Sequence, residues 1–355
     1  MPSRRRMMQL LGAASAAAAG GWALLAPNRS NAYYHGPVSD HFDGTVFFNP
    51  GGVKPKNQLA ILKWQLTDRG VAWPDAFPSP FQPDRPPPRF DGAGARIAHI
   101  GHASFLIQTR GRNILLDPVW AERASPLSFL GPRRVNAPGI AFDALPHVDL
   151  VLITHNHYDH MDVATLGALW QRFRPRMVTP LGNDTILRNS IPGLEAQALD
   201  WDARVDLDGG IGLHVEPTLH WSARGTSDRR HALWASFVLE AGAQRIYCVG
   251  DSGYGDGTTF RRVRQRHPRL TLALLPIGAY EPRWIMRNNH MTPEEALEAL
   301  ELCGAERALG HHWGTFRLTN EAVDEPPQRL STALARGGVA AGRFLAVRPG
   351  QVVLV

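Results

Sequence analysis

The sequence predicts an α/β fold, in which buried strands and helices build a layered domain. Its 355 residues are 44% hydrophobic and 20% charged, with 34 Gly and 28 Pro. This composition is typical of a globular, loop-rich chain with room for one large α/β domain or two small ones. In four places, an apolar run that indicates a strand is followed by a histidine or an aspartate, residue types that bind metals.

Residues 1–32 have the layout of an export signal. The basic stretch Ser3-Arg-Arg-Arg6 precedes an Ala/Gly-rich apolar run, and Ser30-Asn-Ala32 offers a small-x-small cleavage site. Ser-Arg-Arg-Arg-Met-Met is similar to a twin-arginine signal, so we expect export to the periplasm. An uncleaved anchor in the inner membrane is the alternative. The segment holds four arginines and no acid, so the remaining chain carries +2 rather than +6, and no nucleic-acid partner is expected.

Residues 33–92 are predicted to be an irregular N-terminal extension that packs on the core. Only 56–66 hints at a helix, and prolines are dense in 78–88. The aromatic and proline side chains here either cover the core or face lipid or substrate. Both interpretations stay open.

Regular structure is expected over 93–355. The apolar segments 96–100, 104–109 and 113–117 indicate successive strands with glycine-containing turns between them. His102 lies in the first of these turns, as a structural residue or as a neighbour of a metal ligand. The following stretch, 119–148, is a long loop, and such a loop in a compact domain is usually functional.

The segment 154–162, Thr-His-Asn-His-Tyr-Asp-His-Met-Asp, is the strongest signal in the chain. An apolar strand, 149–154, leads into it, and Asp162 is a predicted N-cap for a helix over 162–170. His155 and His157 are two apart, so on extended backbone they point to the same side and can hold one ion. Asp159 and His160 follow the turn and would serve a second ion. Imidazole and carboxylate ligands suit zinc best, with iron or manganese as alternatives.

Later strands end in further candidate ligands. His220 lies at the end of a strand predicted from residue 212 and is a natural third nitrogen for the first ion, whereas His214 within that strand is interpreted as structural. Asp251 follows the second strand of a hairpin, beside Gly250, and its two oxygens could bridge two ions. A strand over 307–310 ends at His311-His312, between which these patterns do not choose.

The other predicted elements complete the α/β pattern. They are a strand at 176–180, a helix at 183–189, hairpin strands at 233–239 and 244–250, a strand at 270–276, and a helix at 296–303 that opens from the capping box Thr292-Pro-Glu-Glu295. Cys248 falls in an apolar run and Cys303 in this last helix. Both are expected to be buried free thiols.

Several longer motifs resemble the metallo-β-lactamase superfamily, and within it the N-acylphosphatidylethanolamine-hydrolysing phospholipase D branch. They occur in the family's order over about 36–330: Ser39-Asp-His-Phe-Asp-Gly44, Gly101-His-Ala103, Thr154–His160, His220-Trp221, Gly250-Asp-Ser-Gly-Tyr254, Ile277-Gly-Ala-Tyr-Glu-Pro-Arg-Trp284, Thr292–Ala296 and His312-Trp-Gly-Thr-Phe316. The resemblance implies an αβ/βα sandwich of two mixed sheets with outer helices and a site at one edge.

The resemblance also implies two zinc ions. The first would be held by His155, His157 and His220, the second by Asp159, His160 and His312, with Asp251 bridging the two as a catalytic ligand. In the family, a hydroxide shared by the metals attacks the phosphorus of a phosphodiester and releases N-acylethanolamine and phosphatidic acid.

Two further positions match residues that line the family's site. Tyr158 and His290 would contact the phosphate, and His290 would also orient the substrate or protonate the leaving oxygen. Asn289 stands where the mammalian branch carries glutamine. The expected partner is a phospholipid with peripheral membrane contact. The oligomeric state stays open, with a homodimer as one option.

Two alternatives remain at this stage. A metallo-hydrolase of the same fold could act on a lactone, a β-lactam or a soluble phosphodiester, because fold does not fix function. The second alternative is a non-catalytic metal-binding envelope protein. The complete set of seven candidate ligands argues against this alternative.

Overall fold

The computed structural model describes residues 30–52, 58–68 and 70–355. All but the last three residues of the predicted export signal therefore lie outside the described residues. Among the described residues of the extension, the helix α2 (Gln58–Thr67) and an isolated bridge between Phe42 and Phe47 are regular, and the others are irregular. Among the described residues, no helix combines the length and hydrophobicity needed to cross a bilayer.

Two seven-stranded sheets form the centre of the molecule. The first has the order β14 (Val352–Leu354), β1 (Ala95–Gly101), β2 (Ser104–Thr109), β3 (Arg112–Leu116), β4 (Leu150–Leu152), β5 (Arg176–Pro180) and β6 (Gln197–Leu199). The second has the order β13 (Phe344–Ala346), β12 (Arg307–His311), β11 (Leu272–Pro276), β10 (Gln244–Cys248), β9 (Ser236–Ala241), β8 (Ile211–Glu216) and β7 (Arg204–Leu207). Both sheets contain antiparallel and parallel pairs of strands. In the first sheet β1–β2 is antiparallel and β3–β4 is parallel. In the second sheet β8–β9 is antiparallel and β11–β12 is parallel.

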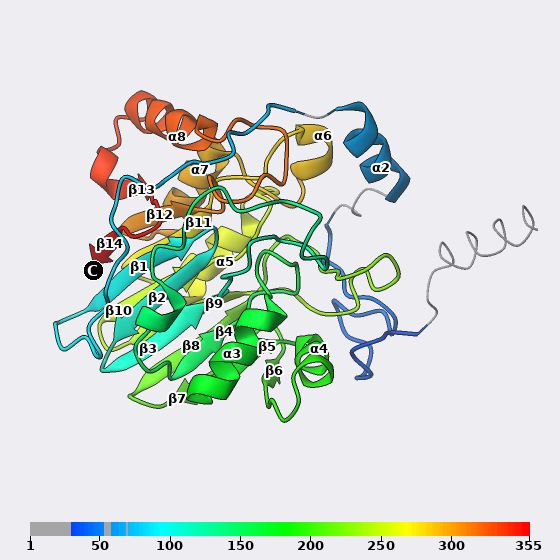
Figure 1. Ribbon diagram of the computed structural model, residues 1–355, viewed down its shortest axis with the longest axis horizontal. Coiled ribbons are helices and arrows are strands. Elements are labelled where there is room, and N and C mark those ends of the chain that lie inside the picture. The colour runs from blue at the N-terminus through cyan, green and yellow to red at the C-terminus, as the bar shows by residue number, and fades with distance from the viewer. Residues whose placement is uncertain (1–29, 53–57, 69) are drawn as a thin grey trace, which may run out of the picture.

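The sheets face each other across one apolar core, and helices cover their outer faces (Figure 1). Inward side chains such as Phe105, Ile114 and Leu152 of the first sheet meet Leu213, Phe237 and Leu274 of the second. The helices α3 (Val163–Phe173) and α4 (Asn183–Ser190) pack on the first sheet, and α5 (Thr258–Arg266), α7 (Pro293–Cys303) and α8 (Glu325–Arg336) on the second. The predicted αβ/βα sandwich is confirmed.

The predicted helix starts are present. Asp162 caps α3 through its side chain, which accepts from the Ala164 and Thr165 amides. Thr292 and Glu295 form the reciprocal capping box of α7. Each cap satisfies amides that the first helical turn leaves without partners. Both cysteines are free and buried, as expected.

The structure differs from the expected elements in two respects. Strand β8 ends at Glu216, so His220 lies in the loop beyond it and not at the strand's end. The elements β6, β7, β13, β14, α5, α8 and the short α6 (Arg283–Met286) were not predicted. Helix α5 buries only Phe260 and Val263 among nine mostly polar residues, which leaves little hydrophobic pattern to recognise.

Candidate metal centre

The seven predicted ligands lie in one cluster at an edge of the sandwich. They come from the loops that follow β4, β8, β10 and β12: His155, His157, Asp159, His160, His220, Asp251 and His312. His157 is half-buried and the other six are buried. Residues 100 and more positions apart in the chain are thus brought together where strands of both sheets end, and strand ends are the usual position for a ligand site in an α/β fold.

The donor atoms of the centre form two adjacent groups. His155, His157, His220 and Asp251 offer atoms that all lie within 4.8 Å of one another. His157 Nδ1 is 2.9 Å from His155 Nε2 and 3.2 Å from His220 Nε2. A second group with the same spread consists of His102, Asp159, His160 and His312.

The carboxylate of Asp251 spans the two groups. Its Oδ2 is 3.5 Å from His220 Nε2 and 3.2 Å from His160 Nε2, and its Oδ1 is 3.1 Å from His312 Nε2. This is the central position that the sequence motif indicated for a bridging carboxylate. The other member of the histidine pair, His311, instead donates from Nε2 to the Val249 carbonyl at 2.8 Å.

Unpaired buried atoms test whether these residues fit a metal. His157 Nε2, His160 Nε2, His312 Nε2 and Asp251 Oδ1 are buried without a hydrogen-bond partner. Buried polar atoms are normally paired, because leaving them unpaired is costly. Nitrogen and carboxylate donors that converge in this way fit a pair of cations, with zinc, iron and manganese all compatible with the donor set.

The protonation states of His157, His220 and Asp251 suit metal binding. Burial is the main cause that lowers the pKa of His157 to about 3 and that of His220 to about 4. Burial alone would raise the pKa of Asp251, but His312, His160 and His290 outweigh it and hold that pKa well below the usual range. At His157 and His220 the result is neutral imidazole beside an ionised carboxylate, which is the form that coordinates metals. Burial alone would also lower the pKa of His160 and His312, but Asp251 and Asp159 outweigh it and raise both, that of His312 to about 9.

Asp117, after β3, holds the first metal-binding loop in place. Its carboxylate accepts from the Thr154 amide at 2.7 Å, from the Thr154 hydroxyl at 2.6 Å and from His160 Nδ1 at 2.7 Å. The bond to His160 fixes that ring and leaves its Nε2 for the cluster. Sequence reasoning treated Asp117 only as the end of a strand, although an aspartate directly after an apolar strand is the same signal that identified Asp251.

Arg224 joins the two ends of the same loop. Its Nη1 donates to the carbonyls of Asn156 at 3.0 Å and Met161 at 2.8 Å. Its guanidinium lies 3.9 Å from the centre of the Tyr158 ring, and the Tyr158 hydroxyl donates to the Arg224 carbonyl at 2.9 Å. Tyr158 therefore lies on the loop beside the cluster, with its hydroxyl proton already engaged.

His290 lies against the centre from the segment before α7. Its ring centroid is 5.2 Å from that of His220 and 5.3 Å from that of His312. His290, Asp251 and His312 each offer a metal-competent atom, and these three atoms lie within 4.8 Å of one another. Its Nδ1 is buried without a partner. Burial holds its pKa well below the usual range, so the ring is neutral.

The residues around His290 fix it in place. The neighbouring Asn289 accepts at its carbonyl from His220 Nδ1 at 3.1 Å, and the His290 carbonyl accepts from Arg283 Nη1 at 2.9 Å. The Arg283 guanidinium also pairs with Glu295 at 2.8 Å. The motif Tyr280–Trp284 thus reaches the centre through Arg283.

Backbone conformation brings the ligand loops close together. Gly250 precedes Asp251 at a point where a Cβ would lie 2.2 Å from Thr154 Oγ1, so no larger residue fits there. His102, Asp117 and His312 all adopt positive φ, at 54°, 40° and 66°. Non-glycine residues in this region tend to mark functional sites, because the surrounding structure must hold them there.

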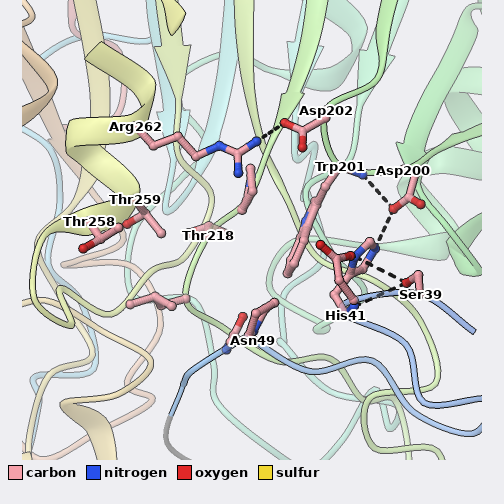
Figure 2. A pocket seen from close by; sticks show the side chains of 14 residues that line it. Ser39, His41, Asn49, Asp200, Trp201, Asp202, Thr218, Thr258, Thr259 and Arg262 are labelled. Atoms are coloured by element: carbon pink, nitrogen blue, oxygen red, sulfur yellow. Dashed lines mark hydrogen bonds and ion pairs between the residues drawn. The ribbon is translucent and has the colours of Figure 1, made fainter. Parts of the chain in front are cut away.

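A cavity of about 460 Å³ lies behind the His220 loop, lined partly by the shared motif that begins at Ser39 (Figure 2). His41 contacts Asp200 Oδ1 at 2.8 Å and stacks on Trp201. Asn49 Nδ2 donates to the His220 carbonyl at 3.0 Å. This part of the extension packs on the core and supports a ligand loop from behind.

Comparisons with known proteins agree with this architecture. Residues 112–313 match the model of a family described as a beta-lactamase superfamily domain. An uncharacterized protein of Mycobacterium tuberculosis is 36% identical over 284 residues, which cover 78% of this chain and 74% of that protein. The N-acyl-phosphatidylethanolamine-hydrolyzing phospholipase D 1 of Caenorhabditis elegans is 33% identical over 271 residues, covering 73% of this chain and 76% of that protein. Among solved structures, a metallo hydrolase of Ignicoccus hospitalis has a TM-score of 0.53 at 22% identity, covering 74% of this chain and 98% of that one.

The family match spans more than half of the chain, and the worm relative exceeds 30% identity over most of it. A protein of Pyrobaculum aerophilum named as a metal-dependent hydrolase is 26% identical over 261 residues, covering 73% of this chain and 100% of that protein. The described residues of this chain contain clusters able to bind metal. The chain belongs to the metallo-β-lactamase superfamily, as a metal-dependent hydrolase that resembles the N-acylphosphatidylethanolamine-hydrolysing phospholipase D branch.

Proposed function

We propose that the protein is a phosphodiesterase of phospholipase D type that acts on N-acylphosphatidylethanolamine-like lipids. Water supplies the oxygen that bonds to phosphorus, the bond from phosphorus to the ethanolamine oxygen breaks, and that oxygen takes a proton. The products are N-acylethanolamine and phosphatidic acid. One observation carries the proposal: the whole donor cluster is present in a chain that is 33% identical to the worm enzyme of this name.

Two metal ions are the proposed cofactors, zinc by preference, with iron or manganese as alternatives. His155, His157 and His220 would hold one ion, Asp159, His160 and His312 the other, and Asp251 both. A bound pair lowers the pKa of a water molecule and neutralises charge on the phosphoryl oxygens. His102 belongs to the second donor group and contacts Asp159 Oδ2 at 2.9 Å, so it would orient that carboxylate.

His290 and Tyr158 are the proposed substrate contacts. The neutral His290 ring has a buried, unpaired Nδ1 beside Asp251 and His312. It could donate one hydrogen bond to a phosphoryl oxygen or to the leaving oxygen, as general acids do. Tyr158 would contribute its ring and hydroxyl oxygen, because its proton is held by the Arg224 carbonyl.

Peripheral membrane contact is proposed through the loop between β3 and β4. Leu127, Phe129 and Leu130 are 42%, 75% and 61% exposed. Three large apolar side chains exposed within four positions indicate a contact surface. The base of this loop packs with Tyr158 and Phe316, next to the centre, so a membrane bound there would bring lipid to the site.

The test uses the purified full chain, zinc and N-acylphosphatidylethanolamine in mixed micelles made with ¹⁸O-labelled water. We expect N-acylethanolamine to be released and the label to appear in phosphatidic acid, because attack is at phosphorus. Asp251→Ala should remove the activity, and Asp206→Ala, at an exposed aspartate of β7, should keep it. Release of fatty acid instead, or turnover of a lactone, β-lactam or soluble phosphodiester but not of the lipid, would replace the proposal with the alternative hydrolase.

Export through a twin-arginine-like signal is proposed on the sequence of residues 1–32 alone. Cell fractionation should recover the protein in the periplasm or, for an uncleaved segment, in the inner-membrane fraction. Replacing Arg4, Arg5 and Arg6 by lysine should retain it in the cytoplasm.

A further inference from the structure

A second group of metal-competent side chains lies away from the catalytic centre. His214 on β8, Glu240 on β9 and His267 at the C-terminal cap of α5 each offer a donor atom, and these atoms lie within 4.8 Å of one another. None of the three belongs to the catalytic cluster. We propose that they form a separate site for a single zinc-type ion that joins the second sheet to α5.

Strand register brings the first two donors together. His214 pairs with Val238 across β8 and β9, and Glu240 pairs with Gly212, so His214 and Glu240 are diagonal neighbours on one face. That face is the outer one, because Leu213 and Val215 point into the central core. His214 Nε2 is 2.9 Å from Glu240 Oε2, and the ring centroids of His214 and His267 are 4.6 Å apart.

His267 has the orientation of a metal-binding histidine. Its Nε2 donates to Glu216 Oε1 at 2.8 Å, and Glu216 is completely buried. A carboxylate that accepts from one ring nitrogen fixes the tautomer and leaves the other nitrogen as an acceptor. Histidines that bind metals are commonly held in this way.

The neighbouring arginines bond to oxygens other than Glu240 Oε2. Arg245 donates to Glu240 Oε1 at 2.8 Å, so Glu240 Oε2 contacts His214 alone. Arg266 donates to Glu216 Oε1 at 2.9 Å, whereas Glu216 Oε2 is buried without a hydrogen-bond partner. Arg262 lies 3.9 Å from that oxygen and instead bonds to Asp202, as Figure 2 shows.

The Glu216 carboxylate already has its own positive charges, because Arg266 and His267 bond to it and Arg262 Nε lies 3.9 Å from its Oε2. Glu216 therefore orients His267 and is not itself a proposed ligand. The donors of His214, Glu240 and His267, which converge within 4.8 Å, are the group that a cation would bind.

Exposure and donor type indicate which ion would bind. The His214 and Glu240 side chains are 13% and 28% exposed, whereas His267 is 3% exposed. An ion can therefore enter from solvent and keep a water as its fourth ligand. Two imidazole nitrogens with one carboxylate suit zinc, and a site of this kind would tie β8, β9 and α5 together.

The experiment measures zinc bound per chain. The purified full chain is dialysed to equilibrium against zinc at a fixed free concentration, and its metal content is determined by elemental analysis. We expect His214→Gln to bind one zinc fewer per chain than wild type. His147→Gln, at a histidine that is 57% exposed, is the matched control and should keep the full content. Because the result is a difference between variants, it does not depend on the occupancy of the catalytic centre.

A second variant and a second measurement keep the test decisive if the first variant does not fold. Glu240→Gln should also lose one zinc, and it decides the outcome if His214→Gln does not fold. Zinc should raise the melting temperature of Asp251→Ala, and this increase should be smaller when His214→Gln is added. Equal zinc content in wild type and in the folded variants would overturn the proposal.

Discussion

Replacing Asp117 by asparagine tests how far the centre depends on a residue that would not touch the metal. The carboxylate makes three hydrogen bonds of 2.6–2.7 Å, two to Thr154 and one to His160. Asparagine has one acceptor oxygen, and its amide would face a second donor. About two charge-assisted hydrogen bonds are then lost, each worth about 1.5–3 kcal/mol. Part of this loss is offset because the neutral asparagine no longer buries a charge. At the metal, loss of such an orienting group costs about 10–100-fold in affinity or activity, equal to about 1.4–2.7 kcal/mol.

The assay is activity as a function of free zinc, with bound metal measured in parallel. For Asp117→Asn, we expect the zinc concentration for half-maximal activity to rise about 10–100-fold, with activity largely restored at saturating zinc. Asp149→Asn is the matched control, because Asp149 is also a poorly exposed carboxylate beside β4 but lies before that strand, away from the metal loop. An Asp117→Asn protein with the zinc dependence of wild type would refute the reasoning that His160 is oriented by Asp117.

Three other predictions follow from particular contacts. Phe129→Ser should weaken binding to anionic lipid vesicles by about tenfold, because burying a phenylalanine side chain contributes about 1.5–3 kcal/mol. Turnover of a soluble substrate should stay unchanged. Equal sedimentation of wild type and variant with the vesicles would contradict this prediction. For Asp149, burial alone would raise the pKa, but Arg89 and the Asn113 amide outweigh it and hold the pKa below the usual range. A carboxyl whose pKa is lowered in the folded state stabilises the fold at pH values above its unfolded-state pKa of about 4, and this stabilisation is lost as the pH falls through the folded-state pKa. Urea unfolding should therefore show Asp149→Asn to be less stable than wild type at pH 7, with the difference narrowing below about pH 4. Gly250→Ala should cost about 1–3 kcal/mol in the same unfolding experiment, because its Cβ would lie 2.2 Å from Thr154 Oγ1; wild-type stability would show that the loop can yield.

The fold class and the proposed ligands were accessible from sequence for a definite physical reason. The buried end of a strand is apolar, so the polar residue that follows it stands out, as Asp251 does after the buried Ile246, Tyr247 and Cys248 of β10. The end of the loop 154–162 could also be predicted from its residue types, because Asp162 both ends the loop and caps α3. Patterns of this kind are local, and a local pattern is what a single sequence can reveal.

Contacts between distant segments were not accessible in the same way. Nothing near Arg224 in the chain indicates that its side chain reaches Asn156 and Met161, because that contact depends on how the loop after β8 folds back. The edge strands β6 and β7 were missed since they are short and their residues half-exposed or exposed, apart from Leu207. The choice of His312 over His311 needed the family motif, and the structure explains it: His311 is used in a bond to Val249.

The loop that carries four of the proposed ligands is held at both of its ends and across its middle. Asp117 binds Thr154 where the loop begins, Asp162 accepts from the Ala121 amide at 2.9 Å where it ends, and Arg224 spans the carbonyls between. His155 Nε2 and His157 Nδ1 are within hydrogen-bond distance at 2.9 Å, but one such bond would not hold a flexible loop in this geometry. The scaffold therefore orders the donors before an ion arrives, and little of the binding free energy is spent on ordering the loop. It follows that substitutions at Asp117 or Arg224 should weaken metal binding and the fold together, whereas a substitution of the ligand His157 should act on the metal far more than on the fold.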